Sequence, residues 1–150
     1  MVKGGVKMNM FDFSNHVIAL ANREGNGITN LELQKVMYFA IGSYIKHNGV
    51  DEFIESIYDE PFEAWPYGPV VRSVYFEHKV SGRSKISDEP EYNADFAALD
   101  PHITEYLGVP IRDLVDESHE HSIWKDNKKQ IMMHETIEYE LGDIEDAFID

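Results

Sequence analysis

Apolar residues recur at helical spacing in two stretches near the start of the chain. Phe13, Val17, Leu20 and Ala21 share one face, which predicts a helix over residues 12–23. A second stripe follows Thr29, which has the form of an N-cap, with Glu32 reaching back to it as in a capping box. The stripe comprises Leu33, Val36, Met37, Ala40, Ile41, Tyr44 and Ile45. Its breadth predicts a helix buried on much of its circumference, ending at Asn48-Gly49 and lying at the centre of the core.

The next part of the chain combines extended segments with turn signals. Residues 54–58 and 62–65 flank residues 59–61 and are expected to form a small β-hairpin or two extended arms. The second segment opens the block Phe62-Glu63-Ala64-Trp65-Pro66-Tyr67-Gly68-Pro69-Val70-Val71. The residue before a proline is biased towards extended geometry, and a proline is tolerated in the first turn of a helix. The block therefore predicts a strand, a tight turn at Gly68 and a helix from Pro69 to Lys79.

The second half of the chain has shorter patterns. Residues 83–86 predict a short extended piece, residues 88–95 and 126–129 predict loops, and residues 101–107 predict a short helix. Pro110 can start another helix, followed by a short helix or turn over residues 117–124. Ile137, Leu141, Ile144 and Phe148 are spaced by four, three and four residues, which predicts a final amphipathic helix.

These elements predict a mainly α fold, a compact α-helical single domain with a minor β-hairpin or extended element before the central Gly-Pro helix. The 150 residues fit one domain, with a flexible N-terminus over residues 1–10 and an acidic C-terminal tail or helix end over residues 142–150. No apolar run approaches the ~18 residues of a membrane span. The chain has no cysteine, which excludes disulfides and cysteine-based sites and favours a cytoplasmic location.

The charge of the chain is large and unevenly distributed. The formal net charge of −15 disfavours direct binding to nucleic acid or membranes and favours a basic protein partner, unless it serves solubility alone. Residues 51–63 hold six acidic residues and residues 134–150 hold seven, with no Lys or Arg in either segment. Basic residues gather in two small patches, residues 72–85 and 125–129. This distribution suits protein–protein contact better than a nucleic-acid groove.

No motif predicts a catalytic residue, a metal site or a cofactor. His119 and His121 are two residues apart, so on a helix they would not share a face or easily chelate one ion. The serines lack a nucleophile elbow, and no phosphate-binding loop is present. A hydrogen-bonding or capping role near Trp124 is expected for His119. A cryptic metal-assisted enzyme that uses His119, His121 or His134 with nearby carboxylates is the rival hypothesis.

Three segments resemble the Panacea antitoxin domain, the family that includes SocA-like and GepA-like phage-associated proteins. Leu33-Gln34-Lys35-Val36-Met37-Tyr38-Phe39-Ala40 is similar to the family's signature helix, which often has a Lys-Leu-Leu-Tyr-like sequence where Val36 and Met37 stand here. The block from Phe62 to Val71, and a His followed by a Trp after a short gap, match the rest of the pattern. The resemblance covers residues 13 to about 141 and does not include the acidic tail.

The resemblance implies an antitoxin whose partner is a protein toxin encoded by an adjacent gene. It would neutralise the toxin by direct binding or act as a proteolytic adaptor that works with a protease. No enzymatic activity and no cofactor are implied. A prophage or mobile-element protein that binds a host factor is an alternative. The signature or partner-binding residues would be Tyr38, Trp65, Tyr67, Gly68, Pro69, Tyr75, His119 and Trp124.

The aromatic residues among these have two possible roles. Tyr38 lies in a helical stripe and is expected in the core. Trp65 and Tyr67 lie on a turn, where they either pack on the Tyr38 helix or are presented to a partner. A signature shared by antitoxins of unlike toxins favours the packing role. Trp65→Ala is then expected to cost about 3–5 kcal/mol of stability.

Overall fold

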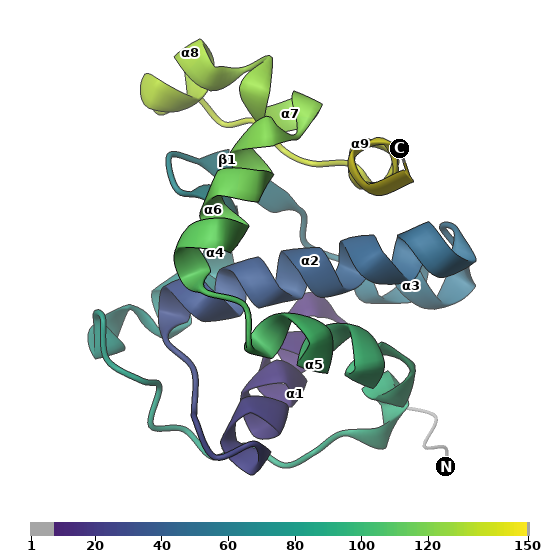
Figure 1. The fold of residues 1–150 in the computed structure, drawn as a ribbon, viewed down its shortest axis with the longest axis vertical. Helices are drawn as coiled ribbons and strands as arrows, with labels where there is room; N and C mark the ends of the chain where they lie inside the picture. Colours follow the sequence, from purple (N-terminus) through teal and green to yellow (C-terminus); the bar gives the residue numbers. More distant parts are fainter. Residues whose placement is uncertain (1–7, 150) are drawn as a thin grey trace.

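The computed structural model describes residues 8–149 and confirms a mainly α fold. Within that range nine α-helices and two 3-10 helices surround one two-stranded hairpin. Helix α2 runs through the middle of the molecule (Figure 1). The elements are α1 (Met10–Arg23), α2 (Asn30–Asn48), α3 (Glu52–Ile57), β1 (Phe62–Trp65), β2 (Gly68–Val71), α4 (Arg72–Glu77), η1 (Lys79–Ser81), η2 (Ala94–Leu99), α5 (Asp100–Leu107), α6 (Ile111–Glu120), α7 (Ser122–Lys125), α8 (Lys128–Met132) and α9 (Leu141–Ile149).

Helix α2 forms the centre of the core, as its apolar stripe predicts. Every residue from Leu33 to Ile45 is buried. The Thr29 side chain accepts a hydrogen bond from the Glu32 amide, and the Glu32 carboxylate accepts one from the Thr29 amide, which confirms the capping box. Helix α1 is confirmed as well. It begins at Met10 because the side chain of Asn9 caps it.

Residues 69–71 form a strand, so the prediction of a helix from Pro69 is wrong. Strand β2 pairs antiparallel with β1, with Trp65 opposite Gly68, and the turn falls at residues 66–67. Helix α4 starts only at Arg72. All four residues of β2 are buried, and adjacent valines such as Val70 and Val71 fit a buried, pleated strand well.

The segment expected to pair with residues 62–65 is helical instead. Residues 52–57 form α3, and the Asp51 side chain caps this helix by accepting a hydrogen bond from the Ile54 amide. An N-cap and acidic residues in the first turn both favour a helix here. The predicted loop over residues 126–129 is also wrong in part, because Lys128 begins the short helix α8, which buries Ile131.

Strand β1 has a second neighbour from far along the chain. The Ala64 amide donates to the Ile137 carbonyl at 2.8 Å, and the Tyr139 amide donates to the Phe62 carbonyl at 2.9 Å. Ile137 therefore lies in an extended segment, and the prediction that it belongs to the last helix is wrong. Buried Tyr139 beside exposed Glu138 has the alternation of a strand.

Helix α9 confirms the predicted final helix and packs on α2. The Phe148 ring lies over Gly42, where an added Cβ would be only 2.2 Å from it. The same ring contacts Tyr38 and Phe39. Residues 1–10 were expected to be flexible, and residues 1–7 lie outside the described residues. Of the remaining three, Met10 is buried at the start of α1. No helix in residues 8–149 is long and apolar enough to cross a lipid bilayer.

Shorter predictions in the second half are mostly confirmed. Helix α5 covers the predicted residues 101–107, and α6 follows Pro110. Residues 117–124 divide between α6 and α7 at His121. The extended piece at residues 83–86 forms a β-bridge between Lys85 and Thr29. The loop before α5 is irregular up to Asn93, which caps η2.

Candidate functional site

Two buried polar side chains of α2 hold the outer edge of β2. Lys35 is fully buried and donates from Nζ to the Pro69 carbonyl at 2.8 Å. Gln34 accepts from the Val71 amide at 2.9 Å and donates to the side chain of Asn30. These groups stand where a further strand would bind, so the edge of β2 is covered. Burial lowers the pKa of Lys35 to about 7.

The geometry of the hairpin explains why Gly68 and Pro69 are accommodated in a strand. The amide of Ala64, opposite Pro69, points away from β2 towards Ile137. The missing N–H of Pro69 therefore leaves no group of β1 without its partner. Gly68 has a φ of 106°, and a Cβ added there would lie 2.5 Å from Oγ of Ser118. The backbone itself thus requires glycine at this position.

Helices α6 and α7 hold the turn through its carbonyl groups. Trp124 Nε1 donates to the Trp65 carbonyl at 2.8 Å, and His119 Nε2 donates to the Pro66 carbonyl at 2.9 Å. The rings of His119 and Trp124 stack with their centroids 3.8 Å apart. The predicted hydrogen-bonding role of His119 near Trp124 is therefore confirmed.

Tyr38 connects α2 to the junction of α6 and α7. Its hydroxyl shares a 2.8 Å hydrogen bond with Nδ1 of His121, and both side chains are buried. Burial lowers the pKa of His121 to about 4 and raises the pKa of Tyr38. The rings of Phe62 and Phe148 pack against Tyr38. Tyr38 is therefore a core residue, as predicted.

The outward side of the hairpin and α4 carries partly exposed aromatic rings. Trp65 is half-buried and lies against Tyr75, with ring centroids 5.0 Å apart, and Phe76 continues the row. Tyr67, in the turn, is 67% exposed, and Phe76 is 49% exposed. The expectation that the rings of Trp65 and Tyr67 pack on the Tyr38 helix is therefore wrong. The hairpin contacts α2 through its backbone at Pro69 and Val71 and through the Phe62 ring, while the Trp65 ring faces α4 and the Tyr67 ring faces solvent.

An ion pair borders this row of rings. Arg72 makes hydrogen bonds of 2.9 and 3.1 Å to the Glu63 carboxylate, and its guanidinium lies 5.7 Å from the centre of the Trp65 ring. Trp65 Nε1 donates to the same carboxylate. Burial alone would raise the pKa of Glu63, but the hydrogen bonds from Arg72 and Trp65 outweigh it and hold that pKa below its usual value. Glu63 is therefore ionised at neutral pH.

A cavity of about 300 Å³ opens between the hairpin and the end of α8. Strand β1 and the turn contribute Trp65 and Pro66, α8 contributes Ile131, and the residues after α8 contribute His134 and Glu135. His134 has a φ of 64°, and no other non-glycine residue in the described range has a positive φ. The cavity thus has an aromatic wall on one side and a titratable rim on the other.

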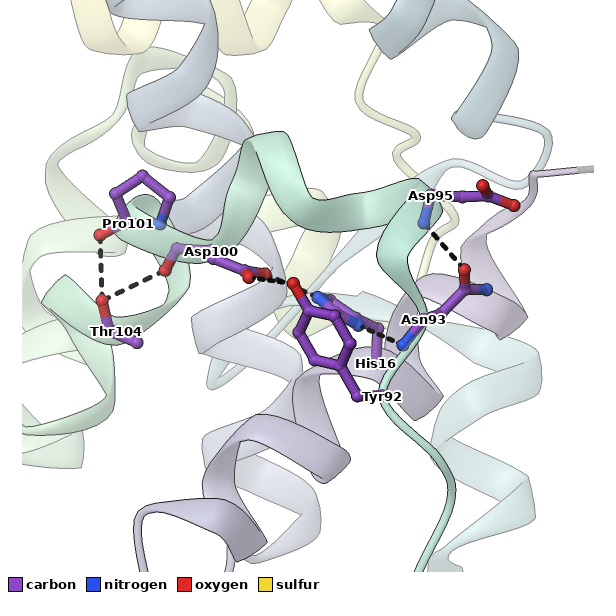
Figure 2. A network of polar contacts seen from close by, with 7 residues as sticks. All are labelled: His16, Tyr92, Asn93, Asp95, Asp100, Pro101 and Thr104. Atoms are coloured by element: carbon purple, nitrogen blue, oxygen red, sulfur yellow. Dashed lines mark hydrogen bonds and ion pairs between the residues drawn. The ribbon is translucent and has the colours of Figure 1, made fainter.

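A separate polar network joins α1, α5 and the loop before η2 (Figure 2). His16 is fully buried, with Nε2 2.7 Å from an Asp100 carboxylate oxygen and Nδ1 accepting from the Asn93 amide. Tyr92 donates to the other oxygen of the same carboxylate. Protein groups occupy both ring nitrogens, so the network holds the loop in place. Sequence reasoning missed it because no spacing connects residues so far apart.

The eight signature residues gather around the hairpin, but they are not equally accessible. Tyr38, Gly68, Pro69 and Trp124 are buried, Trp65, Tyr75 and His119 are half-buried, and Tyr67 is exposed. Sequence reasoning did not single out Gln34 and Lys35 as contacts of the hairpin. The available signal was their polarity inside an otherwise apolar stripe of α2.

The histidines considered for a metal site have separate surroundings. His119 and His121 are bound to the Pro66 carbonyl and to Tyr38, while His134 lies at the rim of the cavity. Within residues 8–149, no group of three or more His, Asp or Glu side chains is placed to hold a metal ion.

Comparison with known proteins connects this arrangement to a family. The family model described as "Antitoxin SocA-like, Panacea domain" matches residues 33–125. The matched span runs from α2 to α7 and contains all eight signature residues, and it is narrower than the 13–141 expected from the sequence. Helices α1 and α9 lie outside it, although both pack on α2. No curated protein and no solved structure matched the chain.

Proposed function

Because the chain belongs to the family of SocA-like antitoxins with a Panacea domain, we propose that it neutralises a protein toxin by binding it directly. The single observation that supports this role is the row of exposed aromatic rings on the hairpin and α4, within the matched segment. Tyr67 and Phe76 are the most exposed of these rings. Large, partly exposed aromatic side chains are typical of the residues that dominate binding energy in interfaces.

The hairpin is well suited to present these rings, because its backbone is held on both sides. Lys35 and Gln34 bind it from α2, and His119 and Trp124 bind it from α6 and α7. A surface that is already ordered loses little conformational entropy on association. Tyr67 thus extends from a rigid turn, where its ring can enter a pocket of the partner.

The charge of the protein adds a long-range attraction to this contact. A net charge of −15 would accelerate encounter with a basic toxin, more strongly at low ionic strength. The binding itself would still depend on the rings, since charges at the rim of an interface mainly affect association rates. We therefore propose a binding protein without enzymatic activity, acting in the cytoplasm.

Co-expression with the product of the adjacent gene tests the proposal. We expect that product to be toxic alone, harmless together with this protein, and recovered with it on co-purification. Tyr67→Ala and Phe76→Ala should each weaken the complex by about 30-fold or more, the range of a binding hot spot. Phe11→Ala is the matched control, because Phe11 is a similarly exposed ring on α1, outside the matched segment.

The outcomes separate the proposal from its alternatives. A harmless neighbouring product with no complex refutes the antitoxin role and favours a host factor as the partner. If both ring variants still neutralise the toxin, the toxin binds to another face of the protein. A toxin half-life that shortens only when this protein is present indicates an adaptor for a protease. Loss of neutralisation on removing a bound metal would support the rival enzyme.

A further inference from the structure

The two acidic segments of the chain meet at the cavity beside the hairpin. Glu63 closes the segment of residues 51–63, and Glu135 begins that of residues 134–150. An antiparallel bridge between Glu63 and Glu138 joins the two segments. Glu63 and Glu135 both line the cavity. Of the two carboxylates, Glu63 is paired with Arg72, so Glu135 provides the unpaired negative charge of this concave site.

The lining already contains the groups that recognise a guanidinium. Arg72 lies over the Trp65 ring while it makes two hydrogen bonds to Glu63, so one guanidinium is bound by an aromatic face and a carboxylate. Glu63 is neutralised by this pair. The side chain of Glu135 pairs with no cation within residues 8–149. A second cation entering the cavity would therefore find a free carboxylate.

The backbone at the rim brings one further side chain to the cavity. The His134 amide donates to the Ile131 carbonyl and the Glu135 amide to the Gln130 carbonyl, which is the hydrogen-bond pattern of a Schellman motif. Glycine is the favoured residue at the left-handed position of this motif, yet His134 occupies it with a φ of 64°. This cap places the His134 imidazole at the cavity.

We propose that this cavity binds the guanidinium of an arginine side chain on the partner protein. Beside the pair of Arg72 and Glu63, Trp65 would provide aromatic surface and Glu135 the unpaired carboxylate, and about 300 Å³ accommodates one long side chain. The identity of the natural occupant, a toxin, rests on the function proposed above. The binding of a guanidinium in the cavity does not depend on that function. Arginine is also among the side chains that most often dominate interfaces.

Titration with N-acetyl-arginine amide, followed by the indole N–H resonances, tests the site without a toxin. The Trp65 signal should shift saturably. The Trp124 signal should stay in place, because its N–H is bound to the Trp65 carbonyl in the interior. N-acetyl-norleucine amide and N-acetyl-aspartate amide should give no saturable shift. Glu135→Gln should weaken binding at least threefold, and Glu120→Gln, on the surface of α6, should leave it unchanged.

Each outcome bears on one proposal only. An unsaturable Trp65 shift, or an equal response to norleucine or aspartate, overturns the arginine site even if the protein neutralises its toxin. Equal binding by the Glu135→Gln and Glu120→Gln variants overturns it as well. Arginine binding by a protein that forms no complex with the toxin leaves the site intact and refutes the antitoxin role.

Discussion

Lys35 Nζ lies 2.8 Å from the carbonyl oxygen of Pro69, inside the protein core. This contact joins the signature helix α2 to the signature hairpin, so the two sequence motifs form one structural unit. Gln34 repeats the connection at Val71. Polar residues that would be unfavourable in a buried helix are thus used to satisfy the free edge of a strand.

Lys35 should make stability depend on pH above neutrality. Its pKa is about 7 in the folded protein and 10.5 ordinarily, so between these values the unfolded chain binds more protons. The burial penalty is fully present below pH 7 and declines as pH rises. Relative to Lys35→Met, the unfolding free energy of the natural protein should rise above pH 7, with a slope that approaches about 1.4 kcal/mol per pH unit by pH 9.

Urea unfolding at pH 6, 7.5 and 9 measures this difference. Lys46→Met is the matched control, because Lys46 is exposed on the same helix. It should show the pH profile of the natural protein. Parallel profiles for the natural protein and Lys35→Met would mean that Lys35 stays protonated in the core.

Gly68→Ala should destabilise the protein for two separable reasons. The left-handed φ of 106° strains any side chain, and the new Cβ would clash with Ser118 Oγ at 2.5 Å. Gly49→Ala measures the strain alone, about 1–3 kcal/mol, since Gly49 has a φ of 76°, a ψ of 177° and open space around it. Gly68→Ala should cost more, and Ser118→Ala in the same chain should recover part of the excess. Equal costs at both glycines in thermal melts would contradict the clash.

The large stability loss expected for Trp65 should instead be found at Trp124. Trp124 is 3% exposed, stacks on His119 and donates to the Trp65 carbonyl. Trp124→Ala should therefore cost about 3–5 kcal/mol in urea unfolding. Trp65→Ala should cost clearly less, because the ring is half-buried. A larger loss for Trp65→Ala than for Trp124→Ala would contradict this order.

Gly42 and Phe148 should be energetically coupled. Gly42→Ala would place a Cβ 2.2 Å from the Phe148 ring and should displace α9. Phe148→Ala should itself cost about 3–5 kcal/mol. In a double-mutant cycle, adding Gly42→Ala to Phe148→Ala should cost little or stabilise, since the clash is gone and alanine favours helix. Additive losses would show that the cost of Gly42→Ala does not come from a clash with the Phe148 ring.

His134→Gly should raise stability by about 1 kcal/mol, because glycine carries no penalty in the left-handed position of the α8 cap. The same variant should bind the arginine probe more weakly, since it lacks the imidazole that lines the cavity and can accept a hydrogen bond from the guanidinium. His134→Ala separates the two effects, as it removes the ring and keeps the strain. His134→Ala should weaken binding of the arginine probe and should not raise the melting temperature. If His134→Gly gains stability and keeps full affinity for the probe, His134 takes no part in binding.

The sequence predicted those elements whose signals are local. Helix α2 has its capping box and its apolar stripe within its own residues, so both were recognisable before folding. Strand β2 could not be recognised in this way. Pro69 is compatible with a first helical turn, and the groups that favour a strand, Gln34 and Lys35, come from another element. The spacing of Ile137 indicated a helix for the same reason. Its segment is extended because it forms backbone hydrogen bonds with strand β1, which lies far away in the sequence.

The candidate site was located from sequence, but the roles of its residues were partly reversed. The aromatic rings of the turn were expected inside and lie towards solvent, whereas the backbone between them is bound to the core. A signature identifies residues that occur together. Which atoms make the contact is decided by the direction of each strand, since alternate residues face opposite sides of a sheet.

The bridge between Glu63 and Glu138 makes the charged surface a property of the folded state. In an unfolded chain the two acidic segments separate, and the field that a basic partner meets becomes diffuse. A ligand that recognises only the folded form adds its binding free energy to the stability of that form. The partner would therefore act as a folding ligand, and the melting temperature of this protein would increase with the partner's concentration.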